Sequence, residues 1–181
     1  MEKRTFSTFE LILLTLFSAL VVVAKIAFRL PVQLPGHSGI FWMAILIVAA
    51  GIVPKRGAAS LVGVTSGVLA AFLGMGDFGA LNTFLSYSLV GIATELALWL
   101  LQSPENLVVA ALVGVIGHLG KFVVKWVLGL ITGTPLGFVA LGLVWSLGGY
   151  ILWGALGGLL GALTLRALRR AGFFTYLAER R

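Results

Sequence analysis

Three side chains that can form strong polar contacts recur along one face of an apolar segment. His118, Lys121 and Lys125 are spaced i, i+3 and i+7, which places them on the same side of a helix. A lysine near the centre of a bilayer costs about 2.5–3.5 kcal/mol on insertion scales, so this face has to look into the protein or into a wet cavity. The spacing indicates either a ligand-facing role for at least one lysine or a structural pairing within the fold.

The structural alternative is a pairing with Glu95, which is the acidic residue well inside an apolar segment. At a rise of 1.5 Å per residue, Glu95 lies ~9 Å from the inner end of its segment, and Lys121 lies ~21 Å from the inner end of the next one. A Glu–Lys pair across ~12 Å of depth would strain both side chains. His118 is closer in depth, so the expected structural ion pair is Glu95 with His118.

Aromatic and hydroxyl side chains on neighbouring segments fall at the depth of the lysines. Counted from the outer ends, Trp145 is level with Lys125, ~9 Å down, and Tyr150 is level with Lys121, ~15 Å down. The loop before residue 42 is able to close over a cavity at this depth. The expected substrate-binding residues are His37, Trp42, Ser86, Tyr87, Lys121, Lys125, Trp145 and Tyr150.

Each of these residue types suits a particular contact with a flat heterocycle. The lysines would supply charge-assisted hydrogen bonds, Trp145 and Tyr150 would stack on the ring, and Ser86 would fix its orientation. Apolar walls with a few placed polar groups are typical of small-molecule sites. Trp42, taken alone, also fits an interfacial belt residue with no ligand.

The composition is that of a membrane protein. Of 181 residues, 60% are apolar and only 10% are charged, against about 25% in a typical soluble domain. So little polar surface cannot cover a water-soluble domain, which excludes a soluble enzyme. The 24 glycines fit closely packed membrane helices. The absence of cysteine excludes disulfides, thiolate nucleophiles and cysteine metal sites.

Six stretches are long and apolar enough to be helices across a ~30 Å hydrocarbon core, which needs about 20 residues. They cover about 9–30, 39–53, 57–73, 79–101, 107–131 and 139–165, and the second is short because it stops at Pro54. The stretches are apolar throughout rather than alternating, which argues against a membrane barrel. We expect an all-α integral membrane protein, with residues 1–181 forming a single six-helix membrane domain.

The basic residues indicate the orientation. Nine of the 13 lie on one side of the six segments, namely Lys3, Arg4, Lys55, Arg56, Arg166, Arg169, Arg170, Arg180 and Arg181. The opposite loops contain Asp77. The positive-inside rule therefore predicts that both termini are cytoplasmic, and it explains the positive charge without nucleic-acid binding. Lys25 and Arg29 are expected to snorkel to the outer interface.

Several reaction types lack the residues that they need. With two histidines and no clustered carboxylates, the sequence argues against a metal site. No phosphate-binding glycine loop followed by Lys-Ser/Thr is present, so the chain has no ATPase of its own. A Ser/His/Asp triad would have to combine Asp77 in an outer loop with a buried His118. We therefore expect neither a catalytic activity nor a cofactor.

The stretch from His37 to Leu101 resembles a known family. It combines Phe41-Trp42-Met43-Ala44, the basic turn Pro54-Lys55-Arg56-Gly57-Ala58, the glycines of the following segment and Glu95-Leu96. In this it is similar to the S components of energy-coupling-factor (ECF) transporters, which are small six-helix proteins of prokaryotic plasma membranes. The turn and Glu95-Leu96 are nearest to the branch that handles thiamine precursors such as hydroxymethylpyrimidine.

The resemblance implies a mechanism and partners. An S component captures a vitamin or vitamin precursor from outside, beneath the loop between its first two helices. It then docks on a transmembrane coupling subunit (T component) driven by two cytoplasmic ATPases. Docking uses a small-residue face on the first helix, commonly Ala-x-x-x-Ala, for which Thr15-x-x-x-Ala19 is the nearest equivalent here. The alternatives are a ligand-free membrane scaffold and a small secondary transporter.

Overall fold

A computed structural model of the chain describes residues 5–28, 35–76, 79–133 and 135–175. These residues form helices and connecting turns, with no strand among them. The helices are α1 (Thr8–Ala27), α2 (Gly39–Ile52), α3 (Ala58–Phe72), α4 (Gly79–Leu101), α5 (Leu107–Ile131) and α6 (Leu136–Arg170). The predicted all-α class is confirmed for the described residues.

Among the described residues, four helices are long and apolar enough to cross a membrane, which indicates a membrane protein. They are α1, α4, α5 and the part of α6 from Trp145 to Arg170. The helices α2 and α3 have only 14 and 15 residues, short of the ~20 that span a hydrocarbon core on their own. At 35 residues, α6 is longer than the predicted 139–165, because nothing between Pro135 and Gly172, whose φ is +73°, breaks the helix.

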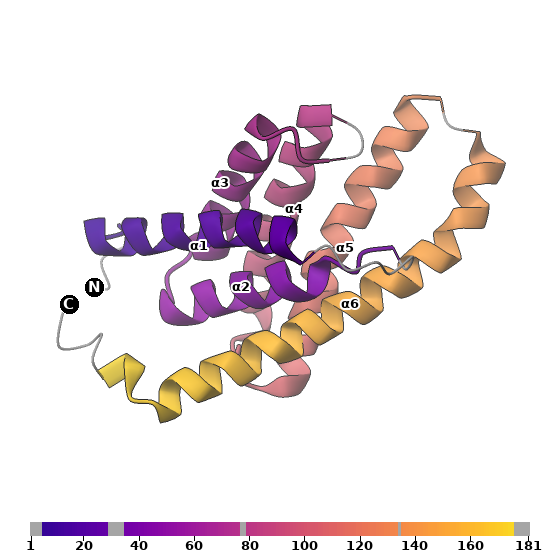
Figure 1. Ribbon diagram of the computed structural model, residues 1–181. Coiled ribbons are helices and arrows are strands. Elements are labelled where there is room, and N and C mark those ends of the chain that lie inside the picture. Colours follow the sequence, from indigo (N-terminus) through magenta and orange to yellow (C-terminus); the bar gives the residue numbers. More distant parts are fainter. Residues whose placement is uncertain (1–4, 29–34, 77–78, 134, 176–181) are drawn as a thin grey trace.

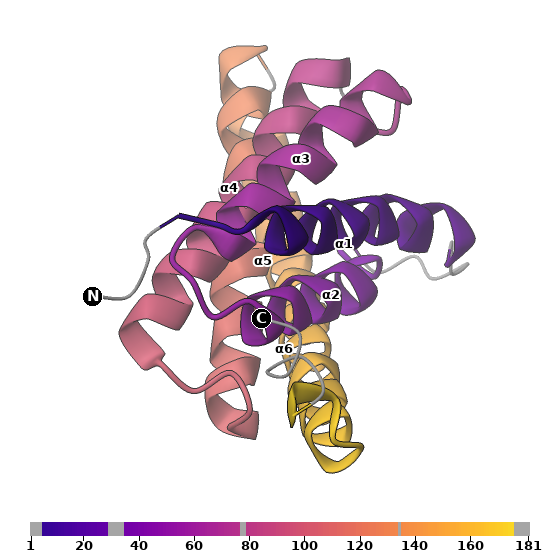
Figure 2. The same ribbon diagram turned by 90° about the vertical axis from the view of Figure 1, so that its left-hand side faces the viewer.

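Two groups of helices cross each other. In Figure 1, α1 and α2 lie across the steeper α3, α4 and α5, and α6 runs diagonally past α2 and α5. The most extensive packing is between α5 and α6, between α3 and α4, and of α6 on α2 and α4 on α5. Figure 2, turned by 90°, also shows α1 and α2 crossing the steep helices.

Glycines let the packed helices touch backbone to backbone. A Cβ added to Gly154 of α6 would lie 2.6 Å from the carbonyl oxygen of Gly114 on α5, and one added to Gly63 of α3 would lie 2.6 Å from the Cα of Gly91 on α4. Gly157 on another face of α6 approaches the Ile40 carbonyl oxygen of α2 in the same way, at 2.8 Å. These three glycines therefore make helix contacts within one molecule, of the kind that small residues allow in membrane proteins.

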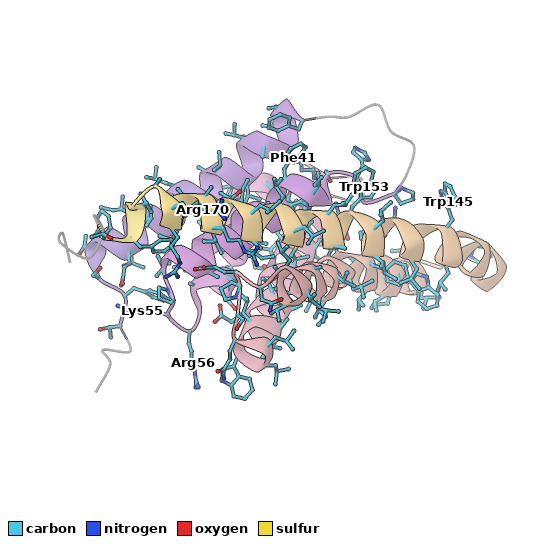
Figure 3. The ribbon with its side chains drawn as sticks, turned by 90° about the horizontal axis from the view of Figure 1, so that it is seen from below. Phe41, Lys55, Arg56, Trp145, Trp153 and Arg170 are labelled. Atoms are coloured by element: carbon cyan, nitrogen blue, oxygen red, sulfur yellow. The ribbon has the colours of Figure 1, made fainter. Side chains whose placement is uncertain are left out.

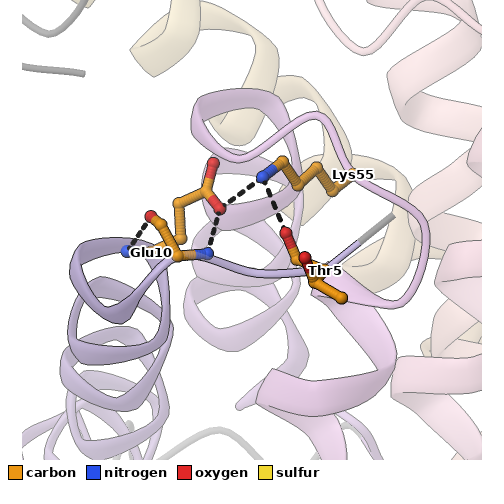
Figure 4. A network of polar contacts seen from close by, with 4 residues as sticks. Thr5, Glu10 and Lys55 are labelled. Atoms are coloured by element: carbon orange, nitrogen blue, oxygen red, sulfur yellow. Dashed lines mark hydrogen bonds and ion pairs between the residues drawn. The ribbon is translucent and has the colours of Figure 1, made fainter. Parts of the chain in front are cut away.

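One end of the molecule is held by ion pairs and helix caps. Ser7 and Glu10 form a capping box at the start of α1. Glu10 also accepts a hydrogen bond from the Lys55 ammonium at 2.6 Å, while the same ammonium donates to the Thr5 carbonyl oxygen at 3.1 Å (Figure 4). This network ties the start of the described chain to the turn between α2 and α3.

Glu95 stabilises the start of α3 rather than pairing with a histidine. Its Oε1 accepts a hydrogen bond from the Gly57 N–H at 2.9 Å, and its Oε2 accepts from Ala59 at 2.9 Å and from Ser60 at 3.5 Å. The N-cap residue Gly57 has φ +94°, which brings its own N–H to the carboxylate. A carboxylate at a helix N-terminus satisfies unpaired N–H groups and opposes the positive end of the helix dipole.

The described basic residues of the expected cytoplasmic side lie away from the middle of the molecule. Figure 3 shows Lys55, Arg56 and Arg170 far from Trp145, which is at the opposite end of α6. Arg169 pairs with Glu105 in the turn between α4 and α5, and Arg166 donates to the Glu105 carbonyl oxygen. The other predicted orientation residues (Lys3, Arg4, Arg180 and Arg181), together with Arg29 and Asp77, lie outside the described residues.

The role of Glu95 predicts a measurable loss of stability. Glu95→Ala should lower the free energy of unfolding by about 1–3 kcal/mol, because it leaves part-buried N–H groups of α3 without their acceptor. Glu95→Gln keeps one acceptor oxygen and should lose less. Thermal melting of the purified protein in detergent measures both.

A matched control for these variants is Glu105→Ala. Its ion pair with Arg169 is more exposed, and such pairs contribute about 0–1 kcal/mol. Equal melting temperatures for Glu95→Ala and the unmodified protein would contradict the capping role.

Candidate functional site

His118 lies next to a close contact between α5 and α6, and it is fully buried. The close approach of Gly154 brings α6 against this part of α5, so that a Cβ on Gly154 would lie 3.0 Å from the His118 Cβ. The His118 Nδ1 is 3.0 Å from the carbonyl oxygen of Tyr150. Since a carbonyl oxygen only accepts hydrogen bonds, this contact requires the proton on Nδ1, and in the neutral ring Nε2 is then an acceptor.

Aromatic rings from three other helices surround this imidazole. The ring centroid of Tyr150 on α6 is 4.7 Å from that of His118, and Trp42 on α2 meets His118 edge to face at 5.6 Å. Tyr87 on α4 is 5.0 Å from Trp42. Trp42, Tyr87 and Tyr150 are all buried, so the rings form a wall of flat surfaces inside the protein.

Two ammonium groups lie against the faces of these rings. The Nζ of Lys121 is 5.5 Å from the centroid of the Trp42 ring, and the Nζ of Lys25 is 5.3 Å from the centroid of the Tyr87 ring. Cation–π contacts of this kind are worth about 0.5–2 kcal/mol, depending on desolvation. We refer to these residues together as the His118 cluster: Lys25, Trp42, Tyr87, His118, Lys121 and Tyr150.

The turn before α2 closes over the His118 cluster. A Cβ added to Gly36 would lie 3.0 Å from the His118 Cε1, and one added to Gly39 would lie 2.5 Å from the His118 Nε2. The carbonyl oxygen of Pro35 presses on Gly149 of α6 in a contact that leaves no room for a side chain there. This part of the chain, between α1 and α2, is the loop that the sequence places above the site.

Two polar atoms of the cluster are buried without a hydrogen-bond partner among the described residues. They are the His118 Nε2, an acceptor in the neutral ring, and the Trp42 Nε1, a donor. A buried donor or acceptor that finds no partner costs about 1–3 kcal/mol. A ligand that satisfies both atoms would recover that free energy on binding.

The structure brings together only part of the predicted site. Trp42, Tyr87, Lys121 and Tyr150 meet in the His118 cluster. His37 is half-buried in the turn above it. From the sequence, Lys25 was expected at the membrane interface and His118 in an ion pair. The position of each residue along its helix gave no indication that Lys25 would contact Tyr87.

The described contacts of the His118 cluster do not include three of the predicted site residues. The Trp145 side chain is 63% exposed, and Lys125 is exposed on α5. Ser86 is buried, but its hydroxyl donates to Asn82 Oδ1 of its own helix at 3.5 Å. The stacking role of Trp145 and the orienting role of Ser86 are therefore not supported. Of the two predicted lysines, Lys121 is the one whose described contacts place it in the His118 cluster.

The predicted ion pair between Glu95 and His118 does not form. Glu95 is bound to the N-terminus of α3, and His118 is bound to Tyr150 of α6. The number of residues from a helix end gives the depth of a side chain in the membrane but not the neighbouring helix that it faces. Glu95 and His118 face different neighbours. The predicted docking residues Thr15 and Ala19 are exposed on α1, opposite the buried Leu14 and Ser18.

The close packing of Gly39 against the His118 imidazole can be tested. Gly39→Ala should lower the free energy of unfolding by about 1–3 kcal/mol, as overpacking does in other cores, because the buried His118 ring has to move off Tyr150. Thermal melting in detergent measures the change. Gly148→Ala on α6 is the matched control, since nothing lies within 4 Å of its added Cβ; a loss as large in this control would show that the effect is not specific to His118.

Comparisons with known proteins give no relative for this chain. No family model matches the sequence, and no curated protein or solved structure matches it.

Proposed function

We propose that the protein is the substrate-binding S component of an ECF-type importer in a prokaryotic plasma membrane. In this proposal all six helices are embedded in the membrane and both termini are cytoplasmic. The protein captures a vitamin or vitamin precursor, such as a thiamine-related pyrimidine, and carries out no reaction itself. ATP hydrolysis takes place on two partner subunits.

The observation that supports this proposal most is the His118 cluster. Two lysines and a histidine are gathered with aromatic rings beneath the turn of residues 35–38. Charged groups inside membrane segments are costly and generally mark functional sites. A scaffold without a ligand would need neither a buried acceptor nor a buried donor without a partner, because apolar side chains of similar size would pack there at lower cost.

The closed turn over the cluster suits capture from the outer side. Gly36 and Gly39 sit directly on His118 and Tyr150, so a molecule enters only when this turn moves away. In the proposed function the turn closes again over the bound substrate. Such a lid excludes water and strengthens the polar contacts beneath it.

The exposed face of α1 supports the proposed docking on a coupling subunit. Thr15 and Ala19 are accessible on it, and the Thr15 hydroxyl donates to the Leu11 carbonyl oxygen at 2.8 Å, within its own helix. The small side chains leave a flat strip between larger apolar residues, where another helix can approach closely.

The function itself is tested by purifying the protein from its own host in a mild detergent. We expect a small aromatic metabolite, identified by mass spectrometry after denaturation, and coupling and ATPase subunits that co-purify. A protein that carries no small molecule and forms no complex with an ATPase would favour the scaffold. Uptake by vesicles that contain this protein alone would favour a secondary transporter.

The docking face predicts a separation of two activities. Ala19→Trp should abolish ATP-dependent uptake of the co-purified metabolite while its binding to the isolated protein stays unchanged, because a large side chain holds the two backbones apart. Ile92→Trp on the exposed side of α4 is the control and should leave uptake intact. Loss of binding together with uptake in Ala19→Trp would refute the assignment of this face.

A further inference from the structure

A groove on the surface of α5 and α6 is separate from the His118 cluster, none of whose residues lines it. The groove has a volume of about 330 Å³ and is open to the outside of the molecule. Its lining is apolar throughout and comes from the beginning of α5, between Leu107 and Val115, and from Ala155 and Leu159 of α6. Both helices are long and apolar enough to cross a membrane, where such a surface faces hydrocarbon.

Close packing of small residues produces this groove. A Cβ added to Gly158 of α6 would lie 3.0 Å from the Cα of Ala111 on α5, so the two backbones touch beside it. Ala111 and Ala155 have only a methyl group each, whereas the other side chains of the lining are Leu and Val. Atoms that line an empty space lose their van der Waals contacts on that side, and a flexible hydrocarbon chain in the groove would restore them.

Arginines lie at one end of the groove. The Arg166 Nε donates a hydrogen bond to the Glu105 carbonyl oxygen at 2.9 Å, which holds this side chain next to the start of α5, where Leu107 begins the lining. Arg166 and Arg170 follow Leu159 by seven and eleven residues, so they lie on its side of α6. At 1.5 Å per residue, Arg166 is ~10 Å beyond Leu159 along the helix.

The charge at this end of the groove is positive. Arg169 pairs with Glu105, and its guanidinium lies 5.2 Å from the centroid of the Phe174 ring. The other described carboxylates are bound at the turn between α2 and α3. Arg166 and Arg170 therefore add two positive charges that Glu105 does not balance. The sequence after residue 175 contributes two arginines and one glutamate, so it does not make this end acidic.

We propose that the groove binds an anionic phospholipid. One acyl chain lies between α5 and α6, and the phosphate accepts hydrogen bonds from Arg166 and Arg170. A planar guanidinium can donate two parallel N–H groups to phosphate oxygens, and basic positions between membrane helices bind anionic headgroups in other proteins. A helix of another protein would also fill the groove, but the arginines favour a ligand that combines hydrocarbon with negative charge. The proposal requires α5 and α6 to lie in a membrane and does not depend on the import function.

Two lipids with the same acyl chains test the proposal on the unmodified protein. Phosphatidylglycerol has a net negative charge, whereas the choline of phosphatidylcholine offsets its phosphate. The full chain is purified in detergent until native mass spectrometry shows no lipid, and each lipid is then titrated. We expect one phosphatidylglycerol per protein, bound about tenfold more tightly than phosphatidylcholine, because charge-assisted hydrogen bonds are the stronger ones. Glycerol 3-phosphate, which has no hydrocarbon, should not bind at the same concentrations.

Variants separate the headgroup contact from the acyl-chain contact. Arg170→Gln should reduce the preference for phosphatidylglycerol several-fold, while Arg56→Gln, at an exposed arginine of the turn between α2 and α3, should leave it unchanged. Ala111→Leu fills the groove and should weaken the binding of both lipids. Ala80→Leu, at an exposed position of α4, is its control and should weaken neither.

The proposal is overturned if phosphatidylcholine binds as tightly as phosphatidylglycerol, or if neither lipid binds. Both comparisons use the unmodified protein, so they decide even where a variant fails to fold. A protein occupant is detected through Leu112→Cys, which puts the only thiol of the chain at an exposed position beside the groove. A disulfide-linked dimer of this variant in the membrane would show that a second copy covers the groove, and it would refute the lipid.

Discussion

The backbone contact between α5 and α6 is the constraint on which the candidate site depends. Membrane helices associate without a hydrophobic driving force between them, so close packing through small residues holds them together. The approach of Gly154 to the carbonyl oxygen of Gly114 brings the His118 imidazole within hydrogen-bond distance of Tyr150. The imidazole in turn supports Gly39 and the turn above it. A side chain at position 154 would separate all of these groups at once.

The helices were predictable because their physical signals are local. Apolar runs broken by Pro54-Lys55-Arg56-Gly57 and similar turns gave the ends of α2 to α5 to within a residue. Counting residues from the helix ends also placed Lys121 and Tyr150 at the same depth, and both belong to the His118 cluster. The sequence did not show how each helix is rotated about its own axis. Depth alone does not tell which neighbour a side chain faces, as the exposed Trp145 shows.

Glu95 shows a second limit of prediction from the sequence. A carboxylate inside an apolar segment was expected to seek a cation, yet here it binds backbone N–H groups of another helix. The signal was present in the sequence as Gly57, since a glycine before a helix allows the left-handed conformation that turns its N–H toward an acceptor. Which acidic residue meets that turn depends on how α3 and α4 pack, and this packing brings together residues as far apart as Gly57 and Glu95, 38 positions along the chain.

The two glycine faces of α6 also have a consequence for biosynthesis. Because α6 packs on α2 through Gly157 and on α5 through Gly154, both of those helices lack their main neighbour until α6 leaves the ribosome. During that interval the short α2 is held only by its smaller contacts with α1, α3, α4 and α5. The His118 cluster therefore forms only after α6 has been synthesised, and a nascent protein arrested before α6 would leave His118 without its acceptor, the Tyr150 carbonyl oxygen.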